Sequence, residues 1–238
     1  MQTTKIHIAG CGDDELRAVL VRPETAGEER AGILLVHDDS GLDPLALDVA
    51  RRFAAEGYVV LAPDLYSRAQ PPEHPAGVGA ELDDRQSGAD LERALERLAA
   101  EPGVDPRRLA AVGFGAGGTL AFLLGCRSDR PAAVVACHGP VVRSELSAAH
   151  PVQPLEMALN LACPLLALFG REDPAIPPEH VKRLRTVLSQ FARSFDIVSL
   201  PDAGRGFFDD RCVGHHEVAA QEAWERTLSF LREHLEPA

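Results

Sequence analysis

A glycine cluster in the middle of the chain constrains the fold more than any other stretch. A short apolar run leads into Gly113, Gly115, Gly117 and Gly118, and a second apolar run follows at 120–124. This order predicts a strand, a tight turn and a helix. Such turns serve two chemistries, because glycine-x-nucleophile-x-glycine presents a nucleophile and glycine-x-glycine-x-x-glycine binds a dinucleotide. The spacing fits both patterns, but Gly115 stands in the nucleophile position and has no side chain.

The bulk composition limits the class of protein. With 238 residues, 45% of them hydrophobic, the chain can bury a full core, and we expect one domain over residues 1–238. Its 24 Lys and Arg against 36 Asp and Glu give a net charge of −12, which argues against nucleic acid and anionic membranes as partners. The five cysteines form no Cys-x-x-Cys pair, and no signal sequence or membrane-spanning run is recognisable, so we expect a cytoplasmic protein with reduced thiols.

Short apolar runs alternate with helical patterns along the chain. Strands are expected at 4–9, 16–21, 32–36, 58–62, 109–113, 132–136, 164–169 and 195–200, the first two as a hairpin. Helices are expected at 44–56, 82–100, 116–126, 178–190 and 216–235. The segment 67–79 is typical of a surface loop beside a pocket, and 141–161 shows no clear pattern. The alternation predicts a mostly parallel sheet with helices on both faces, which binds ligands outside the carboxyl ends of its strands.

Several segments at these strand ends share one further pattern. They are His37-Asp38-x-x-Gly41-Leu42, the block from Glu56-Gly57-Tyr58 to Pro63-Asp64-Leu65-Tyr66, Gly113 to Gly118, Gly170-Arg171-Glu172-Asp173, Gly204-Arg205-Gly206-Phe207 and the helix around Trp224. Together they resemble the dienelactone hydrolase family over about residues 33–235. The resemblance implies an α/β-hydrolase fold.

The family is known for a cysteine–aspartate–histidine triad. The resemblance places the cysteine at Gly115, the histidine at Arg205 and the aspartate at Asp173. Covalent catalysis needs a side chain that attacks and a base that takes its proton. Gly115 cannot attack, and Arg205 does not lose its proton in a protein. We therefore expect no ordinary acyl-enzyme chemistry here, and an ion pair between Arg205 and Asp173.

Other parts of a hydrolase site are retained. The resemblance implies an oxyanion hole formed by the backbone N–H groups of Asp39 and Ala116, which substitution leaves in place. Asp38 corresponds to a family glutamate and has two open roles, as an acid or base in an apolar pocket or as a partner of Arg205. His138 ends a strand at the pocket rim, where it is either a general base or a structural histidine.

Three other sites are less well supported. A dinucleotide site would require an acidic residue about 20 positions after the glycines, yet the next strand ends in Cys137 and His138. Cys137 should point away from the pocket if His138 points into it, because side chains alternate along a strand. The acidic and histidine residues around 209–217 match no strong metal motif. We expect neither a metal nor a cofactor.

The function predicted from the sequence is that of a repurposed family member. We expect an enzyme of secondary metabolism that binds a small unsaturated carbonyl compound or lactone and isomerises, cyclises or dehydrates it without a covalent intermediate. Asp38, Asp173, Arg205 and His138 are the candidate catalytic residues. One alternative is hydrolysis, by direct attack of water or through a displaced nucleophile such as Ser40 or Cys137. Another is a catalytically silent binding or scaffold protein. The partner is a small-molecule substrate, and the protein is a monomer or homodimer.

Overall fold

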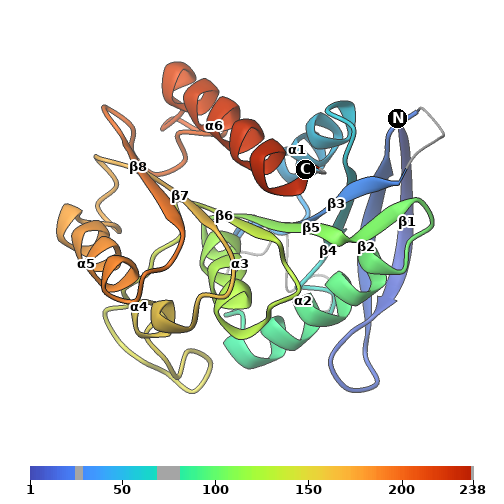
Figure 1. The fold of residues 1–238 in the computed structure, drawn as a ribbon, viewed down its shortest axis with the longest axis horizontal. Helices are drawn as coiled ribbons and strands as arrows, with labels where there is room; N and C mark the ends of the chain where they lie inside the picture. The colour runs from blue at the N-terminus through green and yellow to red at the C-terminus, as the bar shows by residue number, and fades with distance from the viewer. Residues whose placement is uncertain (25–28, 69–80, 237–238) are drawn as a thin grey trace.

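The computed structural model describes residues 1–24, 29–68 and 81–236, so most of the loop predicted at 67–79 lies outside the described residues. Its centre is an eight-stranded sheet in the order β1-β2-β4-β3-β5-β6-β7-β8 (Figure 1). The strands are β1 (Gln2–Ala9), β2 (Glu15–Arg22), β3 (Arg30–Val36), β4 (Val59–Pro63), β5 (Val104–Phe114), β6 (Ala133–Cys137), β7 (Leu165–Gly170) and β8 (Phe195–Leu200). This arrangement confirms the predicted N-terminal hairpin and every predicted strand.

The sheet is parallel except at one edge. β1 and β2 form the antiparallel hairpin, and β2 pairs antiparallel with β4. All other neighbours, from β4 across to β8, pair in parallel. The carboxyl ends of the six parallel strands therefore meet at one rim, where the candidate residues follow them.

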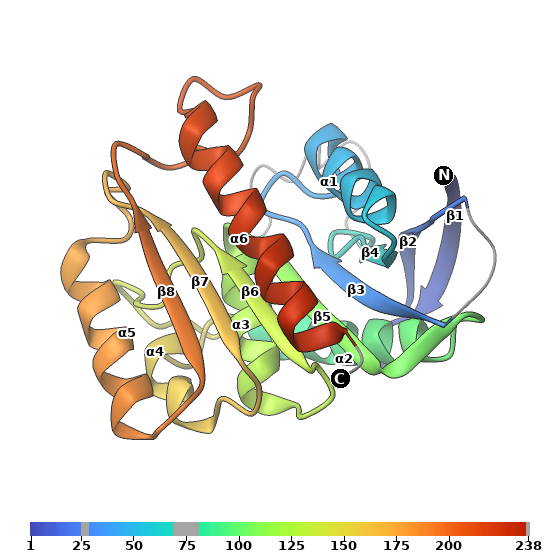
Figure 2. The same ribbon diagram turned by 45° about the horizontal axis from the view of Figure 1, so that its top comes forward.

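Helices cover both faces of the sheet. They are α1 (Pro44–Ala55), α2 (Asp84–Ala99), α3 (Ala116–Arg127), α4 (Pro154–Met157), α5 (Pro178–Gln190) and α6 (Glu217–Leu235), with a short 3₁₀ turn η1 (Ala158–Asn160). Figure 2 shows α1 and α6 on one face and α2 to α5 on the other. Alternate residues of β3 serve the two faces, since Ile33 and Leu35 pack with α1 and α6, and Leu34 and Val36 pack with α2 and α3.

Helix starts follow local chemistry that the sequence contains. The side chain of Asp43 accepts a hydrogen bond from the N–H of Ala46 at the start of α1, and Pro44 is the first helical residue. Asp83 caps α2 in the same way, by accepting from Arg85 and Gln86. No helix of the described residues is long and apolar enough to cross a membrane.

Two regions differ from the expectation. β5 begins at Val104 rather than at 109, because Val104 pairs with Arg30 before a shift in register restores the ladder at Gly32. The unreadable segment 141–161 contains α4 and η1. Both are too short to show a period in the sequence.

Candidate active site

Gly115 forms the turn between β5 and α3. Its backbone has φ 54° and ψ −124°, a conformation that L side chains rarely adopt, and its N–H donates to the carbonyl of Cys137 at 3.0 Å. The neighbouring glycines serve close packing, since a Cβ on Gly113 would lie 2.0 Å from the carbonyl oxygen of Gly117, and a Cβ on Gly117 2.2 Å from that of His37. Packing of α3 against the sheet thus accounts for these glycines without a nucleotide.

A cavity of about 740 Å³ opens beside this turn. Its walls include six of the residues singled out from the sequence: Asp39, Gly115, Ala116, His138, Asp173 and Arg205. These residues come from five separate strand ends, so the sheet itself assembles the site. Asp38 is not among the lining residues, although a Cβ on Gly115 would lie 3.1 Å from its Cβ.

His138 faces the position that a side chain at residue 115 would occupy. A Cβ on Gly115 would lie 3.8 Å from Nε2 of His138. The ring packs against Phe207 and Phe114, with ring centroids 5.6 and 6.1 Å away, and its buried Nδ1 has no hydrogen-bond partner among the described residues. Burial, with a smaller contribution from the charge of Arg205, lowers the pKa of His138 to about 4. The imidazole is therefore neutral at pH 7.

The backbone of His138 is also unusual. Its φ of 42° lies in the left-handed region, which non-glycine residues seldom occupy. The N–H of His138 donates to the carbonyl of Leu168 at 2.7 Å and so ties the turn after β6 to β7. Such strained conformations persist only where the surrounding structure fixes them, and they are often found at functional sites.

The two expected oxyanion donors line the same cavity. Within the described parts of the chain, the backbone N–H groups of Asp39 and Ala116 have no acceptor. The N–H of Ala116 is at the N-terminus of α3, where the helix dipole favours a negative charge. Both groups are thus available to a ligand oxygen, and their catalytic role stays a prediction.

Two residues of the loop after β3 have structural partners. His37 is buried, its Nε2 accepts from the N–H of Leu65 at 3.0 Å, and its Nδ1 therefore donates to the carbonyl of Asp38 at 2.7 Å. Asp38 accepts the N–H of Ser40 at 2.8 Å, and burial raises the pKa of its carboxyl. His37 thus holds the loop in place, while Asp38 keeps an acidic group beside Gly115.

The expected ion pair between Arg205 and Asp173 is not formed, and neither is the alternative pair between Arg205 and Asp38. Arg205 instead meets Asp39 at 3.3 Å, with both side chains more than half exposed. Asp173 is 4% exposed and accepts the N–H of Ala175 at 2.9 Å. The long guanidinium side chain extends to the solvated rim, where a charge costs less to keep than next to a buried carboxylate.

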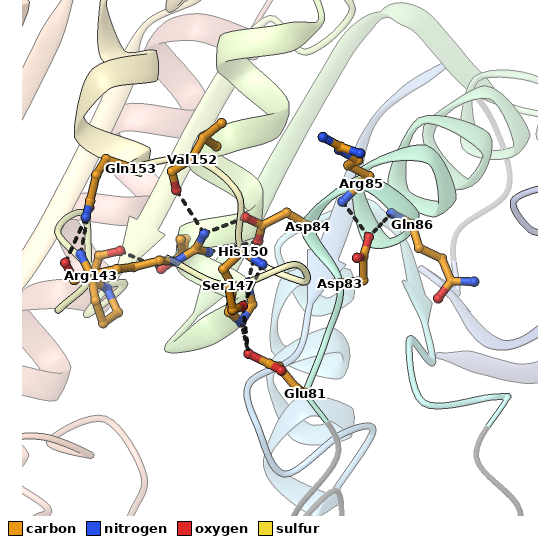
Figure 3. A network of polar contacts seen from close by, with 12 residues as sticks. Glu81, Asp83, Asp84, Arg85, Gln86, Arg143, Ser147, His150, Val152 and Gln153 are labelled. Carbon is orange, nitrogen blue, oxygen red and sulfur yellow. Dashed lines mark hydrogen bonds and ion pairs between the residues drawn. The ribbon is translucent and has the colours of Figure 1, made fainter. Parts of the chain in front are cut away.

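The sequence reasoning missed one wall of the cavity. Arg143 and His150, from the segment after β6, and Asp84, at the start of α2, line it as well. Figure 3 shows that Arg143 donates to both carboxylate oxygens of Asp84, and that His150 lies between Asp84 and Glu81. The position of Arg143 after a parallel strand was a usable signal, because ligands bind at such ends. Asp84 carried no signal, since an acidic residue in the first turn of a helix is ordinary.

The remaining candidates have other surroundings. Cys137 is buried in the core on the α6 side, and burial raises the pKa of its thiol. His215 contacts the carbonyl of Phe207, and His216 caps α6. In the chain as far as the structure describes it, no three His, Cys, Asp or Glu residues are grouped to hold a metal ion.

Two similar proteins align with this chain over nearly its full length. A protein of Salmonella typhimurium named "Putative carboxymethylenebutenolidase" is 32% identical over 228 residues, which cover 93% of this chain and 84% of the relative. A Bradyrhizobium protein named "Probable 2-oxo-3-(5-oxofuran-2-ylidene)propanoate lactonase" is 30% identical over 237 residues, 97% of this chain and 94% of the relative.

A solved structure and a family model agree with these relatives. The solved structure described as "Crystal Structure of Putative Dienelactone Hydrolase from Klebsiella pneumoniae subsp. pneumoniae MGH 78578" superposes with a TM-score of 0.90 at 29% identity, and the match covers 98% of each chain. The model of the dienelactone hydrolase family matches residues 16–235. The match includes all the strand ends that form the cavity. The chain therefore belongs to the dienelactone hydrolase family of α/β-hydrolases.

Proposed function

We propose that this protein opens a small lactone by direct attack of water, without a covalent enzyme intermediate. The observation that carries the proposal is the neutral imidazole of His138, whose Nε2 lies 3.8 Å from the position that a Cβ on Gly115 would take. A water molecule in that space would lie within reach of Nε2 of His138. The relatives named as butenolidase and lactonase support a lactone as the substrate class.

The reaction requires two proton transfers and one oxyanion. Nε2 of His138 takes a proton from the water as its oxygen attacks the lactone carbonyl. The carbonyl oxygen becomes an oxyanion, which the N–H groups of Asp39 and Ala116 stabilise. The intermediate collapses with cleavage of the ring C–O bond. The imidazolium of His138 then returns its proton to the leaving alkoxide, so the enzyme ends in its starting state. With a pKa of about 4, that imidazolium is a strong acid for this second step.

Isomerisation, cyclisation or dehydration is a second candidate, which one observation favours. Asp38 lies beside Gly115 and burial raises the pKa of its carboxyl, so a second proton-transfer group stands near His138. Proton transfer between two substrate atoms would use both groups. Hydrolysis ranks first because Asp38 is not part of the cavity wall and already accepts the N–H of Ser40. An open cavity of about 740 Å³ argues against a silent scaffold.

The test is turnover of a panel of unsaturated γ- and δ-lactones by the wild type and by His138→Gln. We expect the variant to lose at least about 100-fold in kcat/KM, the usual contribution of a general base. His7→Gln, on the exposed side of β1, is the matched control and should keep full activity. In the pH profile of kcat/KM, the wild type should lose activity below about pH 4 rather than below 6.5, because the lowered pKa keeps His138 unprotonated down to that pH.

Three outcomes would contradict this assignment. Full activity of His138→Gln would rule out His138 as the general base. A covalent adduct on Ser40 or Cys137, seen by mass spectrometry of the intact protein, would show a displaced nucleophile. Deuterium from D₂O on a substrate carbon, with no ring-opened acid, would favour the isomerase-type reaction. Cytoplasmic location is part of the proposal, and the five cysteines, all free, support it.

A further inference from the structure

The cavity is lined by more acidic than basic side chains. Two arginines line it, Arg143 and Arg205, against four carboxylates: Asp39, Asp84, Glu145 and Asp173. Arginines that line a pocket would ordinarily favour an anionic ligand. Whether they do so here depends on whether each guanidinium is free or already neutralised by the protein.

Arg143 is neutralised by the protein. Its two terminal nitrogens donate to the two oxygens of Asp84, one of them at 2.8 Å, and its side chain is 15% exposed. It also donates to the carbonyl of Val152 at 3.2 Å (Figure 3). A guanidinium so occupied has little capacity left for a ligand carboxylate.

Arg205 is also paired, because one of its nitrogens lies 3.3 Å from a carboxylate oxygen of Asp39. This contact is exposed and weak in itself. It still places a negative charge beside the guanidinium, so a ligand carboxylate would meet both charges.

Among the described residues, Asp173 has no cationic partner. All lysines and arginines of the chain lie within the described residues, and none forms an ion pair with Asp173 or Glu145. Glu145 is exposed, but Asp173 is 4% exposed and lines the cavity. One of its oxygens accepts the N–H of Ala175, and the other accepts no hydrogen bond from a described residue. That second oxygen is not among the fully buried atoms without a partner, so it is accessible from the cavity, where a ligand ammonium would pair with it.

We infer that Asp173 is an ammonium-binding residue, and that the cavity selects a substrate with a protonated amine in preference to one with a carboxylate. The inference rests on the proposed function only in placing the substrate in this cavity. The amine would bind at Asp173 while the carbonyl group lies over Gly115, since both residues line the same cavity. The net charge of −12 would add long-range attraction for cations.

The test measures binding rather than turnover. Three γ-butyrolactams, whose amide resists ring opening, carry an aminomethyl, a hydroxymethyl or a carboxyl group on the same ring carbon. Calorimetric titration of the wild type should show the ammonium compound binding about tenfold or more tightly than the neutral one, the value of a hydrogen bond to a charged group. The carboxylate should bind most weakly. In Asp173→Asn the preference for ammonium should fall to within about threefold.

Two controls separate this site from the general field of the protein. Glu145→Gln removes the other unpaired carboxylate, and because that group is exposed the preference should change less than twofold. His138→Gln should keep the preference while losing turnover, so failure of the charge inference is distinguishable from failure of the proposed function. Asn at 173 can still accept the N–H of Ala175, and thermal unfolding of the variant checks its fold.

The inference is overturned if the carboxylate compound binds as tightly as the ammonium compound. It is also overturned if Asp173→Asn leaves the preference intact, or if Glu145→Gln abolishes it. Should Asp173→Asn fail to fold, the salt dependence of binding to the wild-type protein tests the inference instead. Because Asp173 is buried, the preference for the ammonium compound should persist in 0.5 M salt. Complete loss of the preference at that salt concentration would show that it arises from the long-range potential of surface charges and would overturn the inference.

Discussion

At the scale of single residues, Gly115 joins a structural and a chemical requirement. Its backbone keeps the strained turn between β5 and α3, with φ 54°, while the missing side chain leaves space in front of His138. The strained turn normally positions a nucleophile. Here it holds the N–H of Ala116 in the cavity wall, so the turn retains a use after the side chain is gone.

Gly115→Ala tests both requirements at once. The new Cβ would lie 3.1 Å from Cβ of Asp38 in a conformation that alanine resists, so we expect a loss of about 1–2 kcal/mol in the free energy of unfolding. It would also take the space of the attacking water, so lactone turnover should fall at least tenfold. Urea unfolding and the lactone assay measure the two effects.

Gly103→Ala is the matched control. Gly103 has a φ of 80° and would meet no atom within 4 Å, so its alanine variant carries the backbone cost alone. We expect about 1 kcal/mol of destabilisation and unchanged turnover. Equal activity of Gly115→Ala and Gly103→Ala would show that the space at Gly115 has no part in the reaction.

At the scale of elements, the residues at the strand ends could be predicted, but the cavity wall formed by Asp84, Arg143 and His150 could not. Apolar runs mark each parallel strand, so the positions of Gly115, His138 and Asp173 at one rim follow from the sequence. The partner of Arg205 did not follow. A side chain with this reach has several carboxylates within range, and only the folded loops decide that Asp39 is the one it meets.

The second missed feature is the junction between α2 and the segment after β6. Asp84 joins them through its carboxylate, which contacts Arg143 and His150, and through its N–H, which donates to the carbonyl of Ala149 at 2.9 Å. The two ends of this junction are 59 residues apart, and nothing in the sequence identifies one as the partner of the other. Contacts of this kind depend on tertiary structure, which periodicity does not report.

Asp84→Asn should therefore destabilise the protein more than an ordinary charge change. It leaves the guanidinium of Arg143, 15% exposed, without its counter-charge, and we expect a loss of about 3 kcal/mol in the free energy of unfolding. Arg93→Gln breaks the exposed pair with Glu96 and should cost less than about 0.5 kcal/mol. Denaturant unfolding compares the two, and similar small losses would show that the junction is solvated.

At the scale of the whole molecule, the sheet divides the core into two halves that share every central strand. One half packs under α2 to α5 and the other under α1 and α6. Because alternate residues of β3 enter opposite halves, neither can lose its packing without disturbing the strand that serves the other. The chain should then unfold as one domain, as its length and composition also predict.

The single tryptophan of the chain makes this prediction measurable. The ring of Trp224, on α6, has its centroid 4.6 Å from that of Phe53, while Leu98, on α2 at the opposite face, is fully buried. Leu98→Ala should lower the free energy of unfolding by about 2–5 kcal/mol through the cavity it leaves. The midpoint from Trp224 fluorescence should move as far as that from far-UV circular dichroism. Leu231→Ala, in the half that contains Trp224, is the matched control and should shift both probes together. A Trp224 transition that ignores Leu98→Ala would mean that the two faces of the sheet unfold independently.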